Sequence, residues 1–113
     1  MSRPSELAAR SARYAPIFAA LGDPTRLALL ARLSEGEPCS IARLTDTTEL
    51  TRQAVSKHLK VLLDARLVHS VKSGRESRFA LTPEPIEDAK RYLDLVSRRW
   101  DEALERLRGL VER

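Results

Sequence analysis

The sequence is poor in cysteine and lacks any long hydrophobic run. Cys39 is the only cysteine among 113 residues, so no intramolecular disulfide can form and a reducing cytoplasm is the expected compartment. No apolar segment approaches the roughly 20 residues that span a bilayer, and the first residues lack the apolar stretch of a secretory signal. We therefore expect a cytoplasmic protein that has no membrane partner.

Sequence patterns of enzyme chemistry are also absent. There is no glycine-rich phosphate loop, no nucleophile elbow and no cluster of histidines and carboxylates with metal-ligand spacing. The acidic residues near the C-terminus are mixed with lysines and arginines, as on a solvated helix face. The sequence therefore predicts neither an enzyme activity nor a cofactor.

Positive charge is concentrated in one part of a chain that has the length of a single domain. The formal net charge is +4. Residues 51–80 contain seven basic and two acidic residues, whereas the rest of the chain contains 13 basic and 14 acidic residues. This segment is the expected electrostatic footprint for phosphates, although a solvated charged face without a partner is the alternative.

Proline and aspartate mark the predicted helix starts in the first third of the chain. Residues 1–13 lack a sustained apolar stripe and are predicted to form a flexible or partly helical arm. Pro16 suits the first turn of a short helix over residues 16–21. Asp23 is predicted to cap a second helix that begins at Pro24. The apolar face of this second helix is predicted to contain Leu27, Leu30, Ala31 and Leu33.

Two further helices follow, joined by a polar segment. Ser40 is predicted to cap the first, and Thr51 is predicted to cap the second, which spans about residues 52–65. The inward positions of the second helix recur at spacings of four and three, at Val55, Leu59 and Leu62. Two short helices, of which the second has a basic outer side, are typical of a helix-turn-helix motif.

The outward side of this second helix carries side chains that suit a DNA major groove. Arginine and lysine can donate to guanine there, and glutamine can pair with adenine. The first residues of a recognition helix reach base edges, so we predict contacts with bases or nearby phosphates from Arg52, Gln53, Ser56 and Lys57. Thr51 and Lys60 are predicted to contact phosphates, and His58 either contacts a phosphate or packs at the helix edge. A solvated surface helix is the alternative.

A β-hairpin is predicted after the basic helix. Residues 67–72 and 77–81 alternate as strands do, and residues 73–76 form the turn between them. Arg75 and Arg78 lie at or beside the tip of this wing, where arginines can enter a narrow minor groove. The alternative for each of them is a plain exposed arginine.

The C-terminal residues predict one long helix with a continuous apolar stripe. Thr82 and Pro83 have the pattern of a helix cap and first turn. Apolar residues then recur at alternating spacings of three and four, at Ile86, Ala89, Leu93, Val96, Trp100, Ala103, Leu107 and Leu110. Trp100 is predicted to anchor a subunit interface, and packing within the chain against the first helix is the alternative.

Four segments together resemble a known family. They are Leu21-Gly22-Asp23-Pro24-Thr25-Arg26-Leu27, Ala54-Val55-Ser56-Lys57-His58-Leu59-Lys60-Val61-Leu62, Ala65-Arg66-Leu67-Val68 and Gly74-Arg75. In this order they resemble the ArsR-type (ArsR/SmtB) winged-helix repressors of prokaryotes, strongly over residues 15–81 and more loosely beyond. The resemblance implies a homodimer that binds an inverted-repeat operator in double-stranded DNA. It also implies a dimer interface made by the first and last helices, at Ile17, Phe18, Leu93, Val96, Trp100, Leu104 and Leu107.

The chain departs from the metal-sensing members of that family. The positions of their Cys-Val-Cys motif hold Ser40, Ile41 and Ala42, and Cys39 lies one residue outside. Residues 86–113 contain no histidine and no cysteine. A zinc or thiophilic site needs about three or four nitrogen or sulfur ligands, so we expect no metal and a metal-independent member. A composite metal site across a dimer, or a redox role of Cys39, remains the alternative.

The expected fold is mainly α (α+β). It comprises a winged helix-turn-helix domain over residues 14–82, with a two-stranded β wing, and a C-terminal dimerisation helix over residues 83–113. The expected function is transcriptional repression by sequence-specific binding to promoter DNA, and the residues identify no inducer. A sensor that a small-molecule, metal or redox signal releases from DNA is an alternative within the DNA-binding class. A winged-helix module for protein–protein contacts is the alternative from another class. Arg26 has two open roles, a phosphate contact or a brace to an acidic neighbour.

Overall fold

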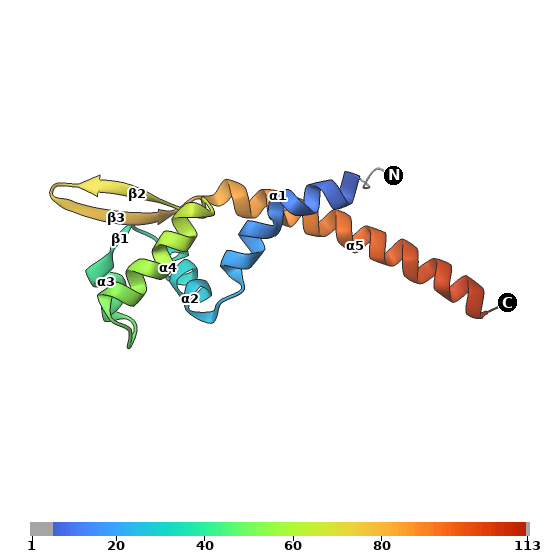
Figure 1. Ribbon diagram of the computed structural model, residues 1–113, viewed down its shortest axis with the longest axis horizontal. Coiled ribbons are helices and arrows are strands. Elements are labelled where there is room, and N and C mark those ends of the chain that lie inside the picture. The colour runs from blue at the N-terminus through green and yellow to red at the C-terminus, as the bar shows by residue number, and fades with distance from the viewer. Residues whose placement is uncertain (1–5, 113) are drawn as a thin grey trace.

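The computed structural model describes residues 6–112 and contains, over that range, five helices and one three-stranded sheet (Figure 1). The sheet and three helices gather at one end, and the last helix projects from the other, giving extents of 67 × 30 × 23 Å. The elements in chain order are α1 (Glu6–Leu21), α2 (Pro24–Ser34), β1 (Cys39–Ser40), α3 (Ile41–Asp46), α4 (Arg52–Asp64), β2 (Val68–Ser73), β3 (Glu76–Leu81) and α5 (Pro83–Val111).

Side-chain caps begin the three central helices, as the sequence predicts. Asp23 accepts a hydrogen bond from the backbone N–H of Arg26 at 3.0 Å, at the start of α2. The hydroxyls of Ser40 and Thr51 accept in the same way at the starts of α3 and α4, each at 3.1 Å. Each cap satisfies a backbone N–H that has no partner inside the helix. The caps therefore fix where the two helices of the helix-turn-helix begin.

The predicted start of the first helix is wrong. The helix α1 begins at Glu6, and Pro16 lies inside it rather than in its first turn. The alanine-rich stretch ahead of the proline favours helix, and stacking of the Tyr14 ring on Tyr92 of α5 holds that stretch in place. Because Pro16 has no N–H, one internal hydrogen bond is lost, and α1 bends along its course (Figure 1). The predicted arm is thus helical from Glu6, and residues 1–5 lie outside the described range.

The hydrophobic core lies between α2, α3, α4 and the sheet. The prediction for α2 is partly wrong, because Leu27 is 51% exposed and Ala31 is exposed, whereas Leu29 is buried beside Leu30 and Leu33. The helix turns this side inward because it packs against both α4 and β3. The inward positions of α4 are confirmed, since Val55, Leu59 and Leu62 are all fully buried.

The sheet contains one strand more than the sequence predicts. The strand order is β1-β3-β2, and the two-residue strand β1 pairs with the middle of β3 through Cys39↔Phe79. The wing itself is the hairpin of β2 and β3, in which Ser73 faces Glu76 across a two-residue turn. Gly74 occupies the first turn position with φ of 64°, a conformation that glycine adopts readily and that tight hairpins require.

The end of α4 is closed by a backbone motif. The N–H of Leu67 donates to the carbonyl of Leu62, and the N–H of Arg66 donates to the carbonyl of Leu63, at 2.9 and 3.0 Å. This pair of bonds defines a Schellman motif. Arg66 occupies its left-handed position, with φ of 61°, where glycine is usual. Leu62 and Leu67 are both buried, so the motif directs the chain from α4 into the wing.

The start of α5 differs from the prediction in one detail. Thr82 stands at the cap position but makes no capping hydrogen bond. Its hydroxyl instead lies 2.8 Å from Nδ1 of His69 on β2. This contact gives the ring of His69 a polar partner and connects the base of the wing to the start of α5.

Candidate nucleic-acid interface

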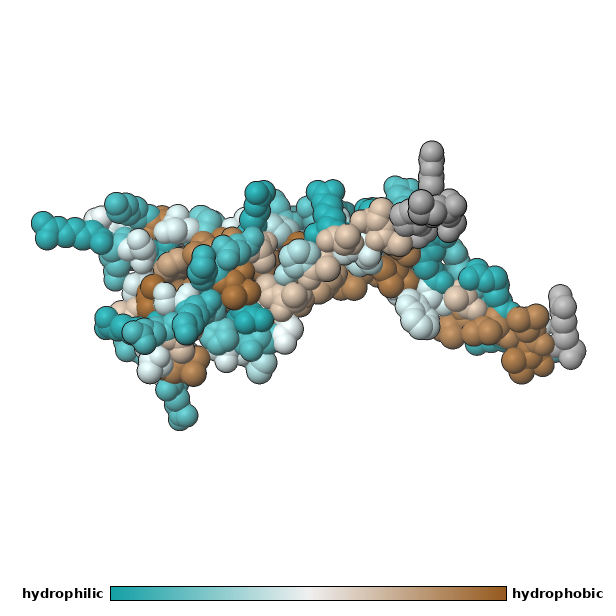
Figure 2. All heavy atoms as spheres, viewed as in Figure 1, coloured by the Kyte–Doolittle hydropathy of each residue, from teal (hydrophilic) through white to brown (hydrophobic). Residues whose placement is uncertain are grey.

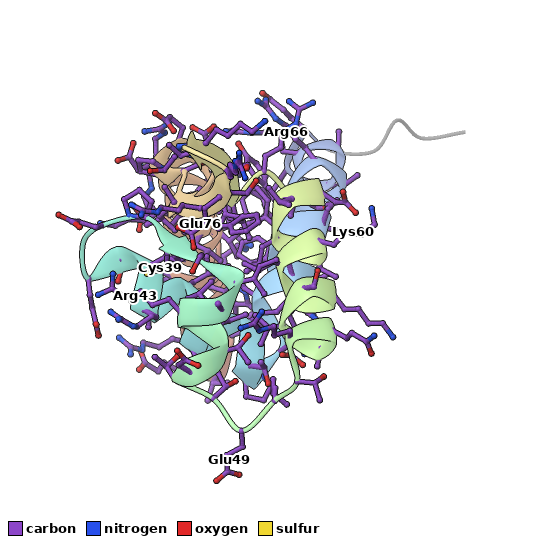
Figure 3. The ribbon with its side chains drawn as sticks, turned by 90° about the vertical axis from the view of Figure 1, so that its left-hand side faces the viewer. Cys39, Arg43, Glu49, Lys60, Arg66 and Glu76 are labelled. Atoms are coloured by element: carbon purple, nitrogen blue, oxygen red, sulfur yellow. The ribbon has the colours of Figure 1, made fainter. Side chains whose placement is uncertain are left out.

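The outward side of α4 presents the predicted DNA-contacting side chains to solvent. Thr51, Arg52, Gln53, Ser56, Lys57 and Lys60 are all exposed. On the opposite side of the helix the leucines and the valine are fully buried. In Figure 3 the Lys60 side chain projects from the outer flank of α4, away from Arg43 on α3. The geometry leaves one continuous polar side free for a partner.

The cations of this side have few competing carboxylates. Lys60 lies 3.8 Å from Asp64, but both side chains are more than two-thirds exposed, so the pair is weak and easily exchanged. Within residues 6–112, Arg52 and Lys57 form no ion pair. Their charges therefore remain available for phosphates or base edges.

His58 is directed differently from its neighbours on α4. Its side chain is only 25% exposed, and its Nδ1 lies 3.3 Å from the guanidinium of Arg26. The same nitrogen lies 3.8 Å from a carboxylate oxygen of Asp23. The sequence leaves two roles open for His58, a phosphate contact or packing at the helix edge, and this geometry favours packing at the helix edge. Arg26 is half-buried, and its side chain contacts two carbonyls of α1 and His58 rather than the side chain of an acidic neighbour.

The two wing arginines are placed unequally. Arg75 lies in the exposed two-residue turn and forms no ion pair within the described chain. Arg78 lies well back in β3, half-buried, and its Nε donates to Glu76 at 3.1 Å. Arg78 also alternates with the buried Phe79, so it lies on the face of the hairpin that turns away from the core.

Lys72 is a basic residue of the wing that sequence reasoning missed. It pairs with Ser77 next to the turn, is exposed, and lies on the same hairpin face as Phe79. The sequence does contain a signal for Lys72. Side chains alternate between the two faces of a strand, so counting back from the predicted turn places Lys72 beside the tip of the wing. Lys72 and Arg75 thus make the tip of the wing cationic.

A second exposed surface runs along α5. Within the described range only Ala89 of this helix is buried, whereas Trp100 is 65% exposed and Leu107 is 58% exposed. Figure 2 shows apolar side chains gathered along one side of the projecting part of α5. We call this surface the α5 stripe, and its exposed members are Leu93, Trp100, Leu104, Leu107, Leu110 and Val111.

The predicted interface residues of α1 lie against the chain itself. Ile17 is half-buried and packs on the core, and the Phe18 ring centre lies 6.1 Å from that of Tyr92. Tyr14 and Tyr92, which stack at 4.9 Å, were not predicted as a contact. Trp100 borders a shallow groove with Leu7 and neighbouring α5 residues and keeps most of its surface exposed.

The residues that would align with a metal motif do not form a cluster. Cys39 is buried in β1, and its thiol faces the carbonyl of Glu37 at 3.5 Å. Over residues 6–112, no group of three or more histidine, cysteine or acidic side chains is arranged to hold a metal ion. None of the helices within residues 6–112 combines the length and the hydropathy of a membrane-spanning segment.

Comparison with known proteins agrees with this geometry. Residues 21–71 match the model of a helix-turn-helix domain family. An HTH-type transcriptional regulator of Mycobacterium tuberculosis is 37% identical over 93 residues, which cover 82% of this chain and 83% of the relative. The arsenical resistance operon repressor of Bacillus subtilis is 34% identical over 66% of this chain and 70% of the relative.

Solved structures extend the similarity to the whole fold. An ArsR-like transcriptional regulator from Rhodococcus sp. RHA1 superimposes with a TM-score of 0.85 at 34% identity, over 92% of this chain and 94% of that one. A second regulator, described as belonging to the ArsR family, gives 0.70 at 30% identity, over 89% and 97% of the two chains. With the exposed basic helix and its wing, these likenesses identify the chain as a member of the ArsR/SmtB family of winged helix-turn-helix transcriptional regulators, which are DNA-binding proteins and not enzymes.

Proposed function

We propose that the protein is a homodimeric, cytoplasmic repressor that binds an inverted-repeat operator. Each copy inserts α4 into the major groove and places the tip of its wing near the adjacent minor groove. The two copies of α4 then enter successive major-groove faces, about 34–36 Å apart. Repression follows because the bound dimer occupies promoter DNA.

The observation that carries this proposal is the outward side of α4. Arg52 and Lys57 are exposed and have no carboxylate partner among residues 6–112. Phosphate contacts from such cations give affinity, and contacts with base edges give sequence preference. Gln53 and Ser56 lie on the same exposed side and supply the donors and acceptors for base edges.

The α5 stripe supports a second copy as the partner of this chain. Soluble monomers rarely leave a large continuous apolar surface in water, and here apolar side chains extend from Leu93 to Val111. Alternating spacings of three and four are those of helices that pack side by side. An isologous pair about a two-fold axis buries the stripe and creates the symmetry that an inverted repeat matches.

We also propose that the protein is regulated independently of metal ions. The aligned Cys-Val-Cys positions hold Ser40, Ile41 and Ala42, and the one cysteine beside them is buried with its thiol turned to a backbone carbonyl. These residue types do not supply the three or four nitrogen or sulfur ligands of a zinc site.

A mobility-shift titration with the DNA upstream of the protein's own gene tests the proposal. We expect a discrete complex that survives an excess of unrelated duplex and weakens as salt rises. Sedimentation should give the mass of a dimer, and added Zn²⁺ or EDTA should leave the complex unchanged. A monomer, or a protein that binds no duplex even at low salt, would contradict the proposal.

A further inference from the structure

One cluster of the structure joins α1, which packs on α5, to α4, the helix that the proposed function places in the major groove. It consists of Asp23, Arg26 and His58, and we call it the Arg26 bridge. Arg26 stands in the first turn of α2. Its guanidinium donates from Nε to the carbonyl of Ala20 at 2.7 Å, and from Nη2 to the carbonyl of Ala19 at 3.2 Å.

The two carbonyls belong to the last turn of α1, where backbone acceptors lack a partner inside the helix. The carbonyl of Ala19 also accepts from the backbone N–H of Gly22, just after the helix, at 3.2 Å. A cation is favoured at that end by the helix dipole. Arg26 therefore caps α1 from outside. Its third contact, from Nη1 to Nδ1 of His58 at 3.3 Å, reaches the middle of α4.

The third contact needs an acceptor on His58. A guanidinium carries donors only, so the hydrogen bond forms where Nδ1 accepts, that is, in the tautomer whose ring proton is on Nε2. The backbone N–H of Arg26 in turn donates to Asp23, whose carboxylate lies on the same side as the imidazole. The bridge thus joins three elements, α1, α2 and α4, through a single side chain.

Direct packing between α1 and the second half of α4 is incomplete. A groove of about 350 Å³ separates them. It is lined by small α1 side chains, by Val61 and Asp64 of α4, by Ala65 just after α4, and by Arg26 itself. The side chain of Val61 is 39% exposed there. Apolar contact therefore constrains the angle between the two helices only weakly at this place, and the hydrogen bonds of Arg26 span the gap.

We propose that Arg26 and His58 are positioning residues that set the angle of α4 relative to α1 and α5. This inference rests on the proposed function, because only a dimer that reads two half-sites needs a fixed angle. With the bridge intact, both copies of α4 meet their grooves at one spacing. With the bridge broken, each α4 still carries its cations but tilts more freely.

His58→Leu tests the bridge, because it removes the Nδ1 acceptor and places an apolar side chain of similar size at the same position of α4. The first probe is a duplex that the wild-type protein enriches from a randomised pool. Two further probes are this duplex with its half-sites moved one base pair closer or farther apart, a change of about 3.4 Å along the DNA axis. The last probe is a scrambled duplex. We expect His58→Leu to bind the enriched duplex about tenfold more weakly. Binding to the scrambled duplex and the salt dependence should not change, and the preference for the original spacing should shrink.

Three further variants separate positioning from folding. His58→Gln keeps an acceptor for Arg26 and should restore most of the spacing preference. Arg26→Lys keeps the charge but cannot reach α1 and His58 together, so it should match His58→Leu, and the double variant should lose little more because both changes break one bridge. Leu33→Val destabilises the core about two helical turns along α2 from Arg26 and should leave the spacing preference intact once folding is verified by circular dichroism.

The outcomes separate the two hypotheses. If the wild-type protein enriches no duplex, the proposed function fails. If it enriches one and the folded bridge variants keep its spacing preference, the bridge has no positioning role. Equal losses on enriched and scrambled duplexes would also overturn the inference, because they would mark His58 as a direct phosphate contact.

Discussion

At the scale of single residues, Arg66 has a strained backbone conformation that the sequence pattern does not indicate. It holds the left-handed position of the turn after α4 with φ of 61°, although it has a side chain. That conformation costs an L-residue about 1–2 kcal/mol relative to glycine. The surrounding hydrogen bonds to Leu62 and Leu63 enforce it.

Replacing Arg66 with glycine should therefore stabilise the fold. We expect Arg66→Gly to raise the free energy of unfolding by about 1 kcal/mol, the strain relieved less the added entropy of the unfolded chain. Urea denaturation followed by circular dichroism measures the change. Arg66→Ala is the matched control, since it removes the charge and keeps the strain. A gain of the same size in the control would assign the effect to charge instead.

Asp23 predicts an acid-dependent part of the stability. Its pKa is held below the ordinary range, chiefly by the hydrogen bond from the backbone N–H of Arg26, with smaller contributions from the charges of Arg26 and His58. A carboxyl whose pKa is lower in the folded state than in the unfolded state adds stability above the unfolded pKa. That contribution disappears as pH falls through the folded pKa.

Asp23→Asn should remove this dependence while keeping a side chain that caps α2. Urea midpoints measured from neutral pH down to about pH 3, below the ordinary carboxyl pKa, should fall less steeply in the variant than in the wild-type protein. The caps of α3 and α4 are hydroxyls, so they do not titrate in this range. Parallel curves for the two proteins would exclude Asp23 as the source.

At the scale of elements, we expect the exposed side of α4 to make two kinds of contact with DNA. Lys60 lies toward the outer flank of the helix (Figure 3), where a phosphate contact is expected, whereas Gln53 lies in its first turn. Lys60→Ala should weaken binding to every duplex and lower the salt dependence by about one counterion per half-site. Gln53→Ala should change the preferred sequence and leave the salt dependence unaltered. Binding titrations at several salt concentrations distinguish the two, and identical behaviour would refute the division.

The wing should depend on Arg75 more than on Arg78. Arg75 is exposed in the turn, whereas Arg78 is half-buried and paired with Glu76. Arg75→Ala should therefore lower DNA affinity and the salt dependence, and Arg78→Ala should do so less, because its charge is already partly neutralised. Glu76→Gln is a useful counterpart, since releasing Arg78 should strengthen binding. The opposite order of the two arginine variants would show that the face of the hairpin matters more than its tip.

Several elements could be predicted because their signals are local. Capping residues place the starts of α2, α3 and α4, and the spacing of apolar residues orients α4 correctly. The errors arise where distant partners decide. The stacking of Tyr14 on Tyr92 extends α1 past Pro16, and pairing with β3 creates β1 from two residues.

The candidate site follows the same rule. The exposed residues of α4 follow from its periodicity, but the inward direction of His58 depends on Arg26, which lies 32 positions earlier in the chain. The pairing of Arg78 with Glu76 depends on a hairpin register that composition does not reveal.

At the scale of the whole molecule, the proposed dimerisation makes the strength of association depend on the α5 stripe. A large, exposed aromatic side chain in the middle of an apolar stripe is the kind of residue that dominates an interface. Trp100→Ala should therefore raise the dimer Kd by roughly thirtyfold or more, as measured by sedimentation over a dilution series.

Trp100→Phe is the matched control for this prediction and should retain most of the association. Because Trp100 is the only tryptophan, its fluorescence also reports the wild-type equilibrium directly and should shift to longer wavelength on dilution. A Trp100→Ala protein that stays as dimeric as the wild type would place the interface elsewhere.

The exposed stripe on α5 also bears on how steeply such a protein responds to its own abundance. Where the subunits are largely dissociated, the amount of assembled dimer grows with the square of the subunit concentration. Under the proposed dimerisation, halving expression would therefore cut operator occupancy to about a quarter in the dilute regime. The length of apolar surface left uncovered in a single copy would then set the expression level at which silencing of the promoter begins.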